Sequence, residues 1–464
     1  MLTYQDFLAV RDNEKQKMQF VQQLIDEHKA SELYQNAIIA TQYNKKHNLT
    51  IEKYQKVLYK VTGEAVPDSY SANWKTKSNY FHRFVVQWAQ YLLGNGVKWK
   101  KAESKKKVGR RFDSSLQILL KKALVGGVSF GFWNFDKLYT FDILEFAPVY
   151  DEENGALMAG VRFWQLSEEK PLRATLYEID GYTDYIKRED GWEVFHPKRG
   201  YIPKARTSKI DGSEIYDYEN YPAFPIIPLW GNDEHQSEIV GLREQIDCYD
   251  FIKNGFANDL DDASLVYWAL KNAGGMDDID LAEFIKRMKT LHASKVDDGV
   301  EVTPQVVDVP YANREAFLDR ASKDLYQSAM AMNSELIANG ANTATQIKAS
   351  YEPLNCKADD LVYQVLEFLD SLMLVVGIED EEPSFTPSVI INAQEEIQNV
   401  LLAENHLSQR YITEKILTLL GDGDKTEEVL RELEIERANQ ITGEQNAESE
   451  SGRQTPEPNQ EGNF

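Results

Sequence analysis

The sequence contains one motif typical of a catalytic serine, Gly127-Val128-Ser129-Phe130-Gly131, which matches the Gly-x-Ser-x-Gly pattern. A nucleophilic serine of this kind sits on a sharp turn that follows a strand and opens a helix, which exposes its oxygen. Here a helical pattern over Leu116–Leu124 precedes the motif and a strand-like run follows it. Because the order of elements is reversed, we interpret the motif as a helix-to-strand turn that needs glycine.

Other candidate reactive groups lack the partners that their chemistry requires. Asp259, Asp261 and Asp262 lie within one helical turn, but the sequence indicates no further ligand near them, so we expect a solvated acidic helix end. The seven histidines form no closely spaced pair of the kind that binds zinc. The segment Gly421–Thr426 has the letters of a phosphate-binding loop at the wrong spacing, with two aspartates. We therefore predict no enzyme, no metal and no cofactor.

Composition restricts the class of protein. The chain has 464 residues, of which 42% are hydrophobic and 27% charged, enough for several packed domains. Its net charge of −24 disfavours tight wrapping of nucleic acid over the whole surface, because phosphate binding depends on Lys and Arg. Two cysteines exclude a disulfide scaffold. No apolar stretch approaches the ~20 residues that span a bilayer, and the N-terminus does not resemble a leader, so we expect a protein made in a reducing cytoplasm.

Basic residues concentrate in one short run. Two interpretations are open: a contact with phosphate, or a solvated lysine-rich loop, which we favour. The run consists of Lys98, Lys100, Lys101, Lys105, Lys106, Lys107, Arg110 and Arg111.

Hydrophobic periodicity divides the first half of the chain into helices and a β-region. Residues 1–60 are helical in pattern, and Asn79–Leu93 forms a strong amphipathic helix that Gly94-Asn95-Gly96 ends. From about 130 to 230, about six short antiparallel strands alternate with turn residues. These strands are expected at Phe130–Phe135, Phe141–Phe146, Ala159–Trp164, Ala174–Ile179, Thr183–Ile186 and Trp192–Phe195.

The second half is mainly helical. Asp233 and Gln236 suggest a capping box for a helix of about 25 residues that runs through Ile239 to Leu260. A compact mixed insert at 264–310 separates it from a second long helix that ends near Met330. This arrangement predicts a stalk with a tip. The remaining predicted segments are a small, amide-rich loop at 331–343, a helical tract to Gly377 that Pro353 kinks or breaks, a β-like piece at 384–391, helices at 394–404, 408–420 and 425–440, and a disordered tail from 441.

In this order the motifs resemble the portal proteins of tailed bacteriophages, the head-to-tail connectors, in particular the long-tailed type from Gram-positive hosts. The resemblance covers roughly residues 30–437. It is carried by Tyr34-Gln35-Asn36-Ala37, Tyr43 and Asn48; by Tyr91-Leu92-Leu93-Gly94-Asn95-Gly96-Val97; by Tyr177-Glu178 and Thr183-Asp184-Tyr185; by Ile226-Ile227-Pro228-Leu229-Trp230-Gly231-Asn232; by Ile246-Asp247, Tyr249-Asp250, Asn258-Asp259 and Asp261-Asp262; and by Ile347-Lys348, Tyr351 and Leu354. The basic run departs from the family pattern.

The resemblance implies an α+β, mainly helical portal fold with a β-rich wing, long stem helices, a small α/β clip and a helical crown. Its parts would be the wing (1–236 with 378–403), the stem (237–263 and 311–330), the clip (264–310), the tunnel loop (331–343), a kinked helix (344–377), the crown (404–440) and a disordered tail (441–464).

The resemblance also implies function. Such proteins form a closed ring, typically of twelve subunits, at one vertex of the virion head after assembly in the host cytoplasm. The ring would pass double-stranded DNA without sequence specificity during packaging and ejection. Its partners would be the terminase motor, the head-tail adaptor and the major capsid or scaffolding protein, with no membrane. Twelve copies carry on the order of −290 charges, which discourages DNA from sticking.

Three groups of residues follow as candidate functional sites. The tunnel loop would approach DNA with neutral hydrogen-bonding groups, the stem would contribute a few channel-lining cations, and the clip would dock motor and adaptor. In that order the groups are Asn333, Ser334, Asn339, Gly340, Asn342 and Thr343; Arg314, Arg320 and Lys323; and Val266, Tyr267 and Trp268. Two alternatives remain: a soluble enzyme of nucleic-acid metabolism with no recognised active site, and another virion head-completion protein.

Overall fold

The computed structural model divides the chain into two compact units, residues 1–340 with 349–388, and residues 341–348 with 389–464. It describes residues 2–59, 63–68, 71–207, 214–262, 267–271, 277, 279–280, 283–284, 286–287, 301–305, 311–334, 346, 349–387 and 393–436. The mixture of helices and antiparallel sheets confirms the predicted α+β class.

The first unit begins with four helices, each capped by a polar side chain. They are α1 (Tyr4–Val10), α2 (Glu14–Ala30), α3 (Glu32–Asn44) and α4 (Leu49–Lys53). The side-chain oxygens of Thr3, Asn13, Ser31 and Asn48 accept hydrogen bonds from the otherwise unpaired first amides of these helices. A short hairpin of β1 (Val57–Tyr59) and β2 (Ala65–Pro67) follows, so the predicted helical pattern ends before residue 60.

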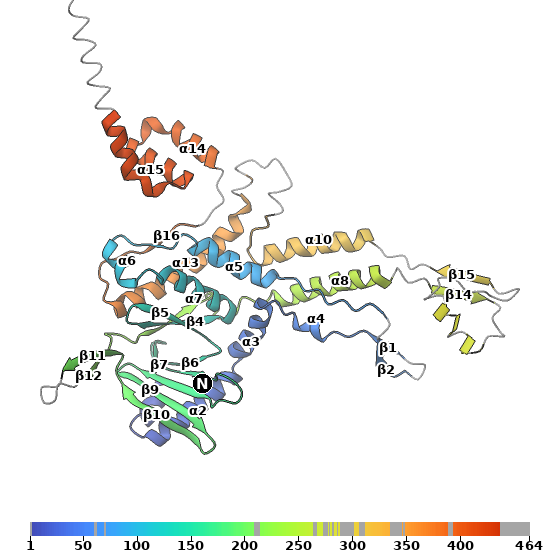
Figure 1. Cartoon of the computed structure of the whole chain (residues 1–464), viewed down its shortest axis with the longest axis horizontal. Helices are drawn as coiled ribbons and strands as arrows, with labels where there is room; N and C mark the ends of the chain where they lie inside the picture. The colour runs from blue at the N-terminus through green and yellow to red at the C-terminus, as the bar shows by residue number, and fades with distance from the viewer. Residues whose placement is uncertain are drawn as a thin grey trace, which may run out of the picture. The chain divides into compact units, whose positions relative to one another are not determined.

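Two antiparallel sheets form the body. One is a meander in the order β10-β9-β8-β7-β6, whose buried face shares a core with Phe20, Val21, Leu24 and Ile25 of α2 (Figure 1). The other has the order β13-β4-β5. The strands are β4 (Val128–Asn134), β5 (Lys137–Asp142), β6 (Phe146–Tyr150), β7 (Leu157–Trp164), β8 (Arg173–Glu178), β9 (Gly181–Arg188), β10 (Gly191–Arg199) and β13 (Ile226–Trp230).

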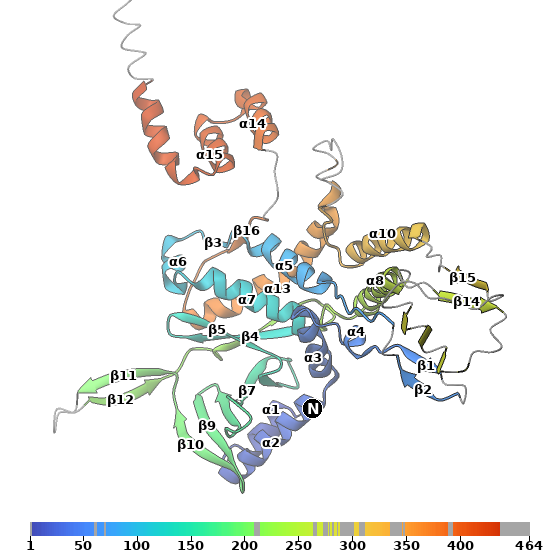
Figure 2. The same ribbon diagram turned by 45° about the vertical axis from the view of Figure 1, so that its right-hand side comes forward.

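The predicted β-region is confirmed, but two of its details were wrong. The run Phe141–Phe146 is a turn between two strands, because Phe141 lies near the end of β5 and Phe146 begins β6. The sequence also missed the hairpin of β11 (Ile202–Thr207) and β12 (Glu214–Glu219), which pairs only with itself among the described strands and extends from the body (Figure 2). Alternating charged residues in these two strands give no hydrophobic pattern.

A helical layer covers the three-stranded sheet. It consists of α5 (Tyr80–Leu93), α7 (Phe112–Gly126) and α13 (Glu352–Val376), with Trp88, Leu120 and Phe368 fully buried. Pro353 lies in the first turn of α13, where its missing N–H removes no helical hydrogen bond, so it marks the start of this helix rather than a kink within it. The basic run is only partly a loop: Lys105, Lys106 and Lys107 lie in α6 (Ala102–Val108), and Lys98 lies in β3 (Val97–Lys98), which pairs with β16 (Ser384–Phe385).

The two long helices of the predicted stalk are α8 (Arg243–Asp262) and α10 (Tyr311–Ser328), and between them β14 (Tyr267–Lys271) pairs with β15 (Glu301–Gln305). The predicted start of the first helix was wrong. Gly241 has φ of +81°, so Ile239 and Leu242 are buried in a turn before α8, and no capping box forms at Asp233. A left-handed residue cannot continue a right-handed helix.

The second unit contains α14 (Ala393–Leu402), η1 (Glu404–His406), α15 (Gln409–Leu420), η2 (Gly423–Lys425) and a helix at 426–436. These helices confirm the predicted helical character of this region, while the tail from 441 lies outside the described residues. Across the described ranges of both units, every helix is too short or too polar to cross a bilayer.

Candidate functional site

The two stem helices, α8 and α10, lie side by side and contact each other far from the body (Figure 1). Arg314 of α10 forms an ion pair with Asp259 of α8, and its guanidinium lies 5.9 Å from the ring centroid of Phe256. Tyr311 packs edge-on against the same ring at 5.8 Å. Charge and aromatic contacts therefore join the helices at the end that leads to β14 and β15.

At the end near the body, both stem helices pack against α5. The ring of Tyr80 meets Tyr249 of α8 and Tyr326 of α10 edge-on, at 5.1 and 5.9 Å between centroids. The Tyr80 hydroxyl is 2.9 Å from the hydroxyl of Ser322 on α10. One tyrosine of the body thus contacts both helices.

Carboxylates of α8 accept hydrogen bonds from the N-terminal helices. Asp247 accepts from the hydroxyls of Tyr43 and Thr50, and the fully buried Asp250 accepts from the amide of Asn48 at 2.9 Å. Burial, together with the hydrogen bond to Asp247, raises the pKa of Tyr43 to about 12, so the phenol stays a donor. Burial raises the pKa of Asp250, although hydrogen bonds from Asn48 and the segment near residue 78 oppose the shift.

An extended segment at 72–79 runs along α8 and is bound by side chains one helical turn apart. The three backbone bonds join Trp74 N–H to Asn258, Thr76 N–H to Asn254 and Ser78 N–H to Asp250, at 2.6, 2.7 and 2.9 Å. Two residues of extended chain advance about 6.6 Å and four residues of helix about 6 Å, so alternate amides match successive turns. Sliding or rotating α8 would break this set of bonds.

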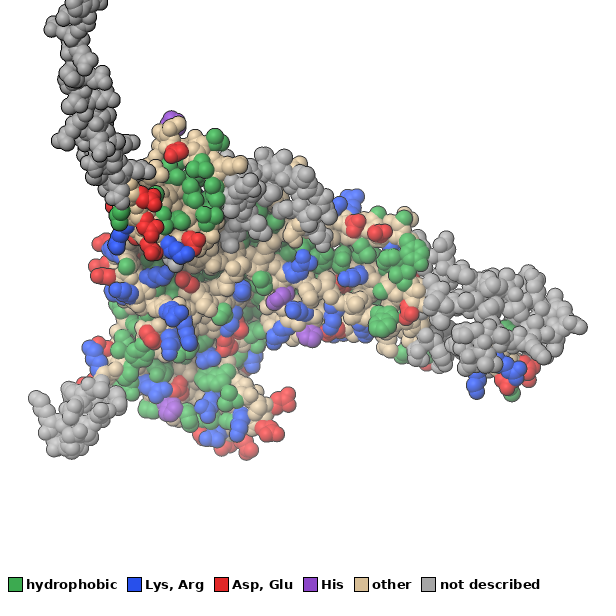
Figure 3. Space-filling model, turned by 45° about the horizontal axis from the view of Figure 1, so that its top comes forward, with side chains coloured by type: hydrophobic (Ala, Val, Ile, Leu, Met, Phe, Trp, Pro, Cys, Tyr) green, Lys and Arg blue, Asp and Glu red, His purple; other side chains and the backbone are tan. Residues whose placement is uncertain are grey.

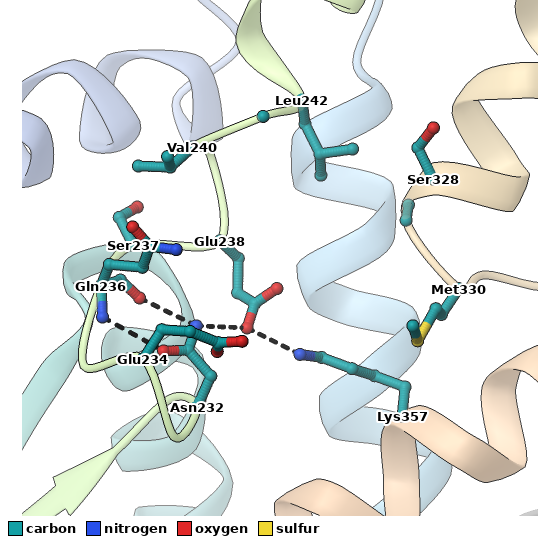
Figure 4. A pocket seen from close by; sticks show the side chains of 12 residues that line it. Asn232, Glu234, Gln236, Ser237, Glu238, Val240, Leu242, Ser328, Met330 and Lys357 are labelled. Atoms are coloured by element: carbon teal, nitrogen blue, oxygen red, sulfur yellow. Dashed lines mark hydrogen bonds and ion pairs between the residues drawn. The ribbon is translucent and has the colours of Figure 1, made fainter.

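Both stem helices meet the body around a cavity of about 260 Å³. Figure 4 shows Glu238, from the segment before α8, and Lys357 of α13 facing each other, with Ser328 and Met330 at the end of α10. The Lys357 ammonium is 2.7 Å from the carboxylate of Glu238, and their side chains are 11% and 13% exposed. Asn232 donates to the same carboxylate oxygen at 2.8 Å. We call this group of contacts the joint.

The predicted tunnel loop begins inside the body. Met330, at φ of +46°, ends α10, and the next three residues are buried, including Asn333 at 8% exposure. Gln87 of α5 both donates to the carbonyl of Met332 at 2.9 Å and accepts from its amide at 3.1 Å. Ser334 is exposed, whereas Asn339, Gly340, Asn342 and Thr343 lie outside the described residues. The start of the loop is therefore fixed to α5.

The predicted stem cations are not equivalent. Arg314 forms an ion pair with Asp259, and its role as a channel-lining group stays a prediction. The Arg320 side chain is 84% exposed and lies 3.8 Å from Asp324 on the same helix, and Lys323 is exposed. Arg320 and Lys323 stay predictions as channel-lining groups.

The predicted clip residues lie at the edge of the described chain. Tyr267 and Trp268 begin β14 and stand opposite Gln305 and Pro304 of β15, whereas Val266 falls outside the described residues. These two strands pair within the chain, and both the clip assignment and its docking role stay predictions.

The candidate reactive groups have structural roles. Ser129 is buried at the helix-to-strand turn, and its hydroxyl donates to the carbonyl of Leu119 at 2.8 Å. The acidic helix end is not simply solvated, because Asp259 pairs with Arg314 and Asp261 accepts from the indole of Trp74 at 3.0 Å. Among the residues that the structure describes, no cluster could hold a metal ion.

Comparison with known proteins gives consistent matches. A family model described as "Phage portal protein, SPP1 Gp6-like" matches residues 22–443. A portal protein of Bacillus phage SPP1 is 25% identical over 356 residues, which cover 73% of this chain and 68% of that protein. A portal protein of Clostridium phage phiCD119 is 26% identical over 159 residues, 34% of this chain and 35% of that protein. Among solved structures, the neck of a native GTA particle computed with C12 symmetry matches with 14% identity and a TM-score of 0.43, over 73% of this chain and 89% of that chain.

Proposed function

The chain belongs to the SPP1 Gp6-like family of phage portal proteins, and from this we propose that it forms a closed ring, typically of twelve copies, at one vertex of the virion head. In that ring it passes double-stranded DNA during packaging and ejection. The observation that carries the proposal is the stem: α8 and α10 are joined at both ends, and α8 is bound to the body along its length.

Rigid paired helices suit the wall of a channel. DNA moving through a ring exerts force along the channel axis, and a helix held by the 72–79 segment resists sliding. The stem would comprise α8 and α10, the clip β14 and β15, and the crown η1, α15 and the helix at 426–436. The wing would comprise the sheets with α5 and α7, together with α14.

Partners follow from these parts. The clip would dock the terminase motor during packaging in the host cytoplasm and later the head-tail adaptor, and the wing would contact the major capsid or scaffolding protein. We infer that the protein carries out no catalysis itself, which is supported by the buried and hydrogen-bonded state of Ser129. Its contribution to packaging would be mechanical.

Ring formation is tested by measuring mass in solution. Light scattering on the purified full-length protein should give a mass many times 53.2 kDa, and negative-stain images should show rings. A stable monomer at micromolar concentration would contradict the proposal.

The clip is tested by deleting residues 270–300. The body should keep its melting temperature because the deleted residues contribute little to its described core, whereas heads should fill with no DNA. A normal yield of DNA per head would contradict the proposal that the clip docks the terminase motor.

The loop is tested by replacing Asn339 and Asn342 with lysine. About 24 new cations, two in each of about twelve subunits, would hold phosphate and slow packaging, more strongly at low salt. The matched control replaces the same two residues with glutamine, which adds bulk without charge. If the wild type and both variants package the same length of DNA per head at two salt concentrations, the assignment of the loop to the channel is wrong.

A further inference from the structure

The basic run divides into two groups in the structure. Residues 98–111 contain eight Lys and Arg side chains and one acid, Glu103, in a chain of net charge −24. One group, which we call the inward group, is bound to the segment 377–382, which follows α13, although its side chains remain exposed; Lys98, in β3, belongs to neither group. The other group faces outward.

The inward group holds α6 against the body. Lys107 donates to the carbonyl of Gly377 at 2.8 Å, Lys101 donates to the carbonyl of Glu379 at 3.0 Å, and Lys100 forms an ion pair with Glu382. These three lysines are therefore already occupied, and their partners lie about 280 residues away in the sequence.

A buried carboxylate fixes the start of the same helix. Glu381, which is 8% exposed, accepts hydrogen bonds from the backbone amides of Lys100 and Lys101 and from the hydroxyl of Ser104 at 2.6 Å. Two of these bonds fix the residues just before α6, and the third fixes the Ser104 side chain in its first turn, all from a distant segment. These bonds anchor α6, which carries Lys105 and Lys106, whereas Arg110 and Arg111 follow it in the turn before α7.

The outward group consists of Lys105, Lys106, Arg110 and Arg111, which we call the α6 patch. All four are exposed, and none has a side-chain hydrogen bond or ion pair to another residue in the described part of the chain. Elsewhere on the body, basic and acidic side chains are interspersed (Figure 3). Between the four cations, Val108 is buried and no large apolar side chain is exposed.

We propose that the α6 patch binds the phosphate backbone of double-stranded DNA without reading its sequence. The composition of the patch favours DNA over an acidic protein partner. Protein interfaces have an apolar or aromatic centre and are depleted in lysine, whereas the α6 patch offers only exposed cations, the pattern that binds phosphate.

The contact would lie away from the channel. In both Figure 1 and Figure 2, α6 lies on the opposite side of the body from α8 and α10. The proposal rests on the proposed function only for the presence of duplex DNA around this protein. It goes beyond that function because it adds a place where DNA is held rather than passed.

The test is a salt titration of DNA binding. The full-length protein, in whatever oligomeric state it adopts, is titrated into a fluorescent duplex short enough to meet one patch at a time, between about 50 and about 200 mM salt. The variant replaces all four patch residues with glutamine. The matched control replaces four exposed lysines scattered over the body, Lys15, Lys45, Lys46 and Lys170, with glutamine.

The plot of log affinity against log salt has a negative slope, and losing four phosphate contacts should make it shallower by up to about 3.6. Between about 50 and about 200 mM salt, the wild type should therefore lose about two orders of magnitude more affinity than the patch variant. The control should keep the wild-type slope, and both variants should keep the wild-type melting temperature. An unchanged slope in the patch variant, or no binding by the wild type at the lowest salt, overturns the proposal. If the patch variant changes only the oligomeric mass, the patch binds another subunit instead. If the protein does not form a ring, the mass measured by light scattering will show it. The DNA titration does not depend on that mass and still tests the patch.

Discussion

Replacing Lys357 with methionine should destabilise the first unit by about 3 kcal/mol. Its ammonium is 2.7 Å from Glu238, and both side chains are nearly buried. Removing one partner of a buried ion pair costs about 3–5 kcal/mol, because the other charge is left without its counterion. We take the lower end, because Asn232 still donates to Glu238. Methionine keeps most of the lysine stem, whose ammonium lies 5.7 Å from the ring centroid of Trp88, so little of the loss would come from a new cavity.

A double-variant cycle separates the ion pair from other effects. Glu238→Gln combined with Lys357→Met should recover about 2 kcal/mol relative to the sum of the single changes, since the buried charge of Glu238 is then removed together with its counterion. The 3.7 Å contact between Lys357 and Asp360 is lost in both the single and the double variant, so it cancels in the cycle. The matched control is Lys323→Met, which removes an exposed lysine of α10 and should change stability by less than about 0.5 kcal/mol.

Thermal melting followed by calorimetry measures these changes. The entropy of unfolding grows with chain length, so in a unit of this size 1 kcal/mol corresponds to about 1–2 °C, and Lys357→Met should melt about 3–6 °C lower. A loss below 1 °C, or single variants whose effects simply add, would refute the conclusion that this ion pair holds the joint.

Three further substitutions test separate parts of the fold. Ser129→Ala should cost about 1 kcal/mol through its lost bond to Leu119 and leave DNA packaging intact; lost packaging at an unchanged melting temperature would restore a chemical role. Gly127→Ala should cost at least about 2 kcal/mol in melting experiments, because φ is +86° and a Cβ would lie 2.9 Å from the backbone of Gln236. Burial lowers the pKa of His28, so the unfolded chain binds more protons near pH 6 and wild-type stability should fall from pH 7 to pH 5. In the His28→Gln variant, stability should fall less between pH 7 and pH 5. The same dependence of stability on pH in the variant and the wild type would contradict this.

Periodicity predicted the elements whose stabilising contacts are local or repetitive. The amphipathic helix over Asn79–Leu93 buries one face in the expected way, and β7 and β9 of the meander alternate in part between buried and half-buried residues. The same signal placed the start of α8 too early, because Ile239 and Leu242 have helical spacing in a turn that Gly241 makes. Buried residues in a compact turn and in a helix can share a spacing.

Helix α6 was missed for a different reason. It has no apolar stripe, and the groups that fix its N-terminus come from Glu381 rather than from its own sequence. A local pattern contains no information about a contact made from about 280 residues away.

The motifs that indicated the family also turn out to be in contact. Tyr43 and Asn48 bind Asp247 and Asp250, which explains why these residue types occur together without any catalytic purpose. The sequence showed their order but not their pairing. It likewise suggested a solvated Asp259, because Arg314, its partner, follows only after the whole clip.

Charged side chains therefore have two distinct environments in this protein. In the stem and the joint, Asp259 and Glu238 are matched by Arg314 and Lys357. Helices α8 and α10 together carry nine acidic and five basic residues, so this pair of helices is net negative toward a passing phosphate. In the α6 patch the cations are unmatched. Salt screens electrostatic interactions between exposed charges beyond about 8–10 Å at moderate ionic strength. Attraction of phosphate by the α6 patch therefore does not cancel the repulsion of phosphate by the stem. A single chain of net charge −24 can thus let DNA slide at one surface and retain it at another.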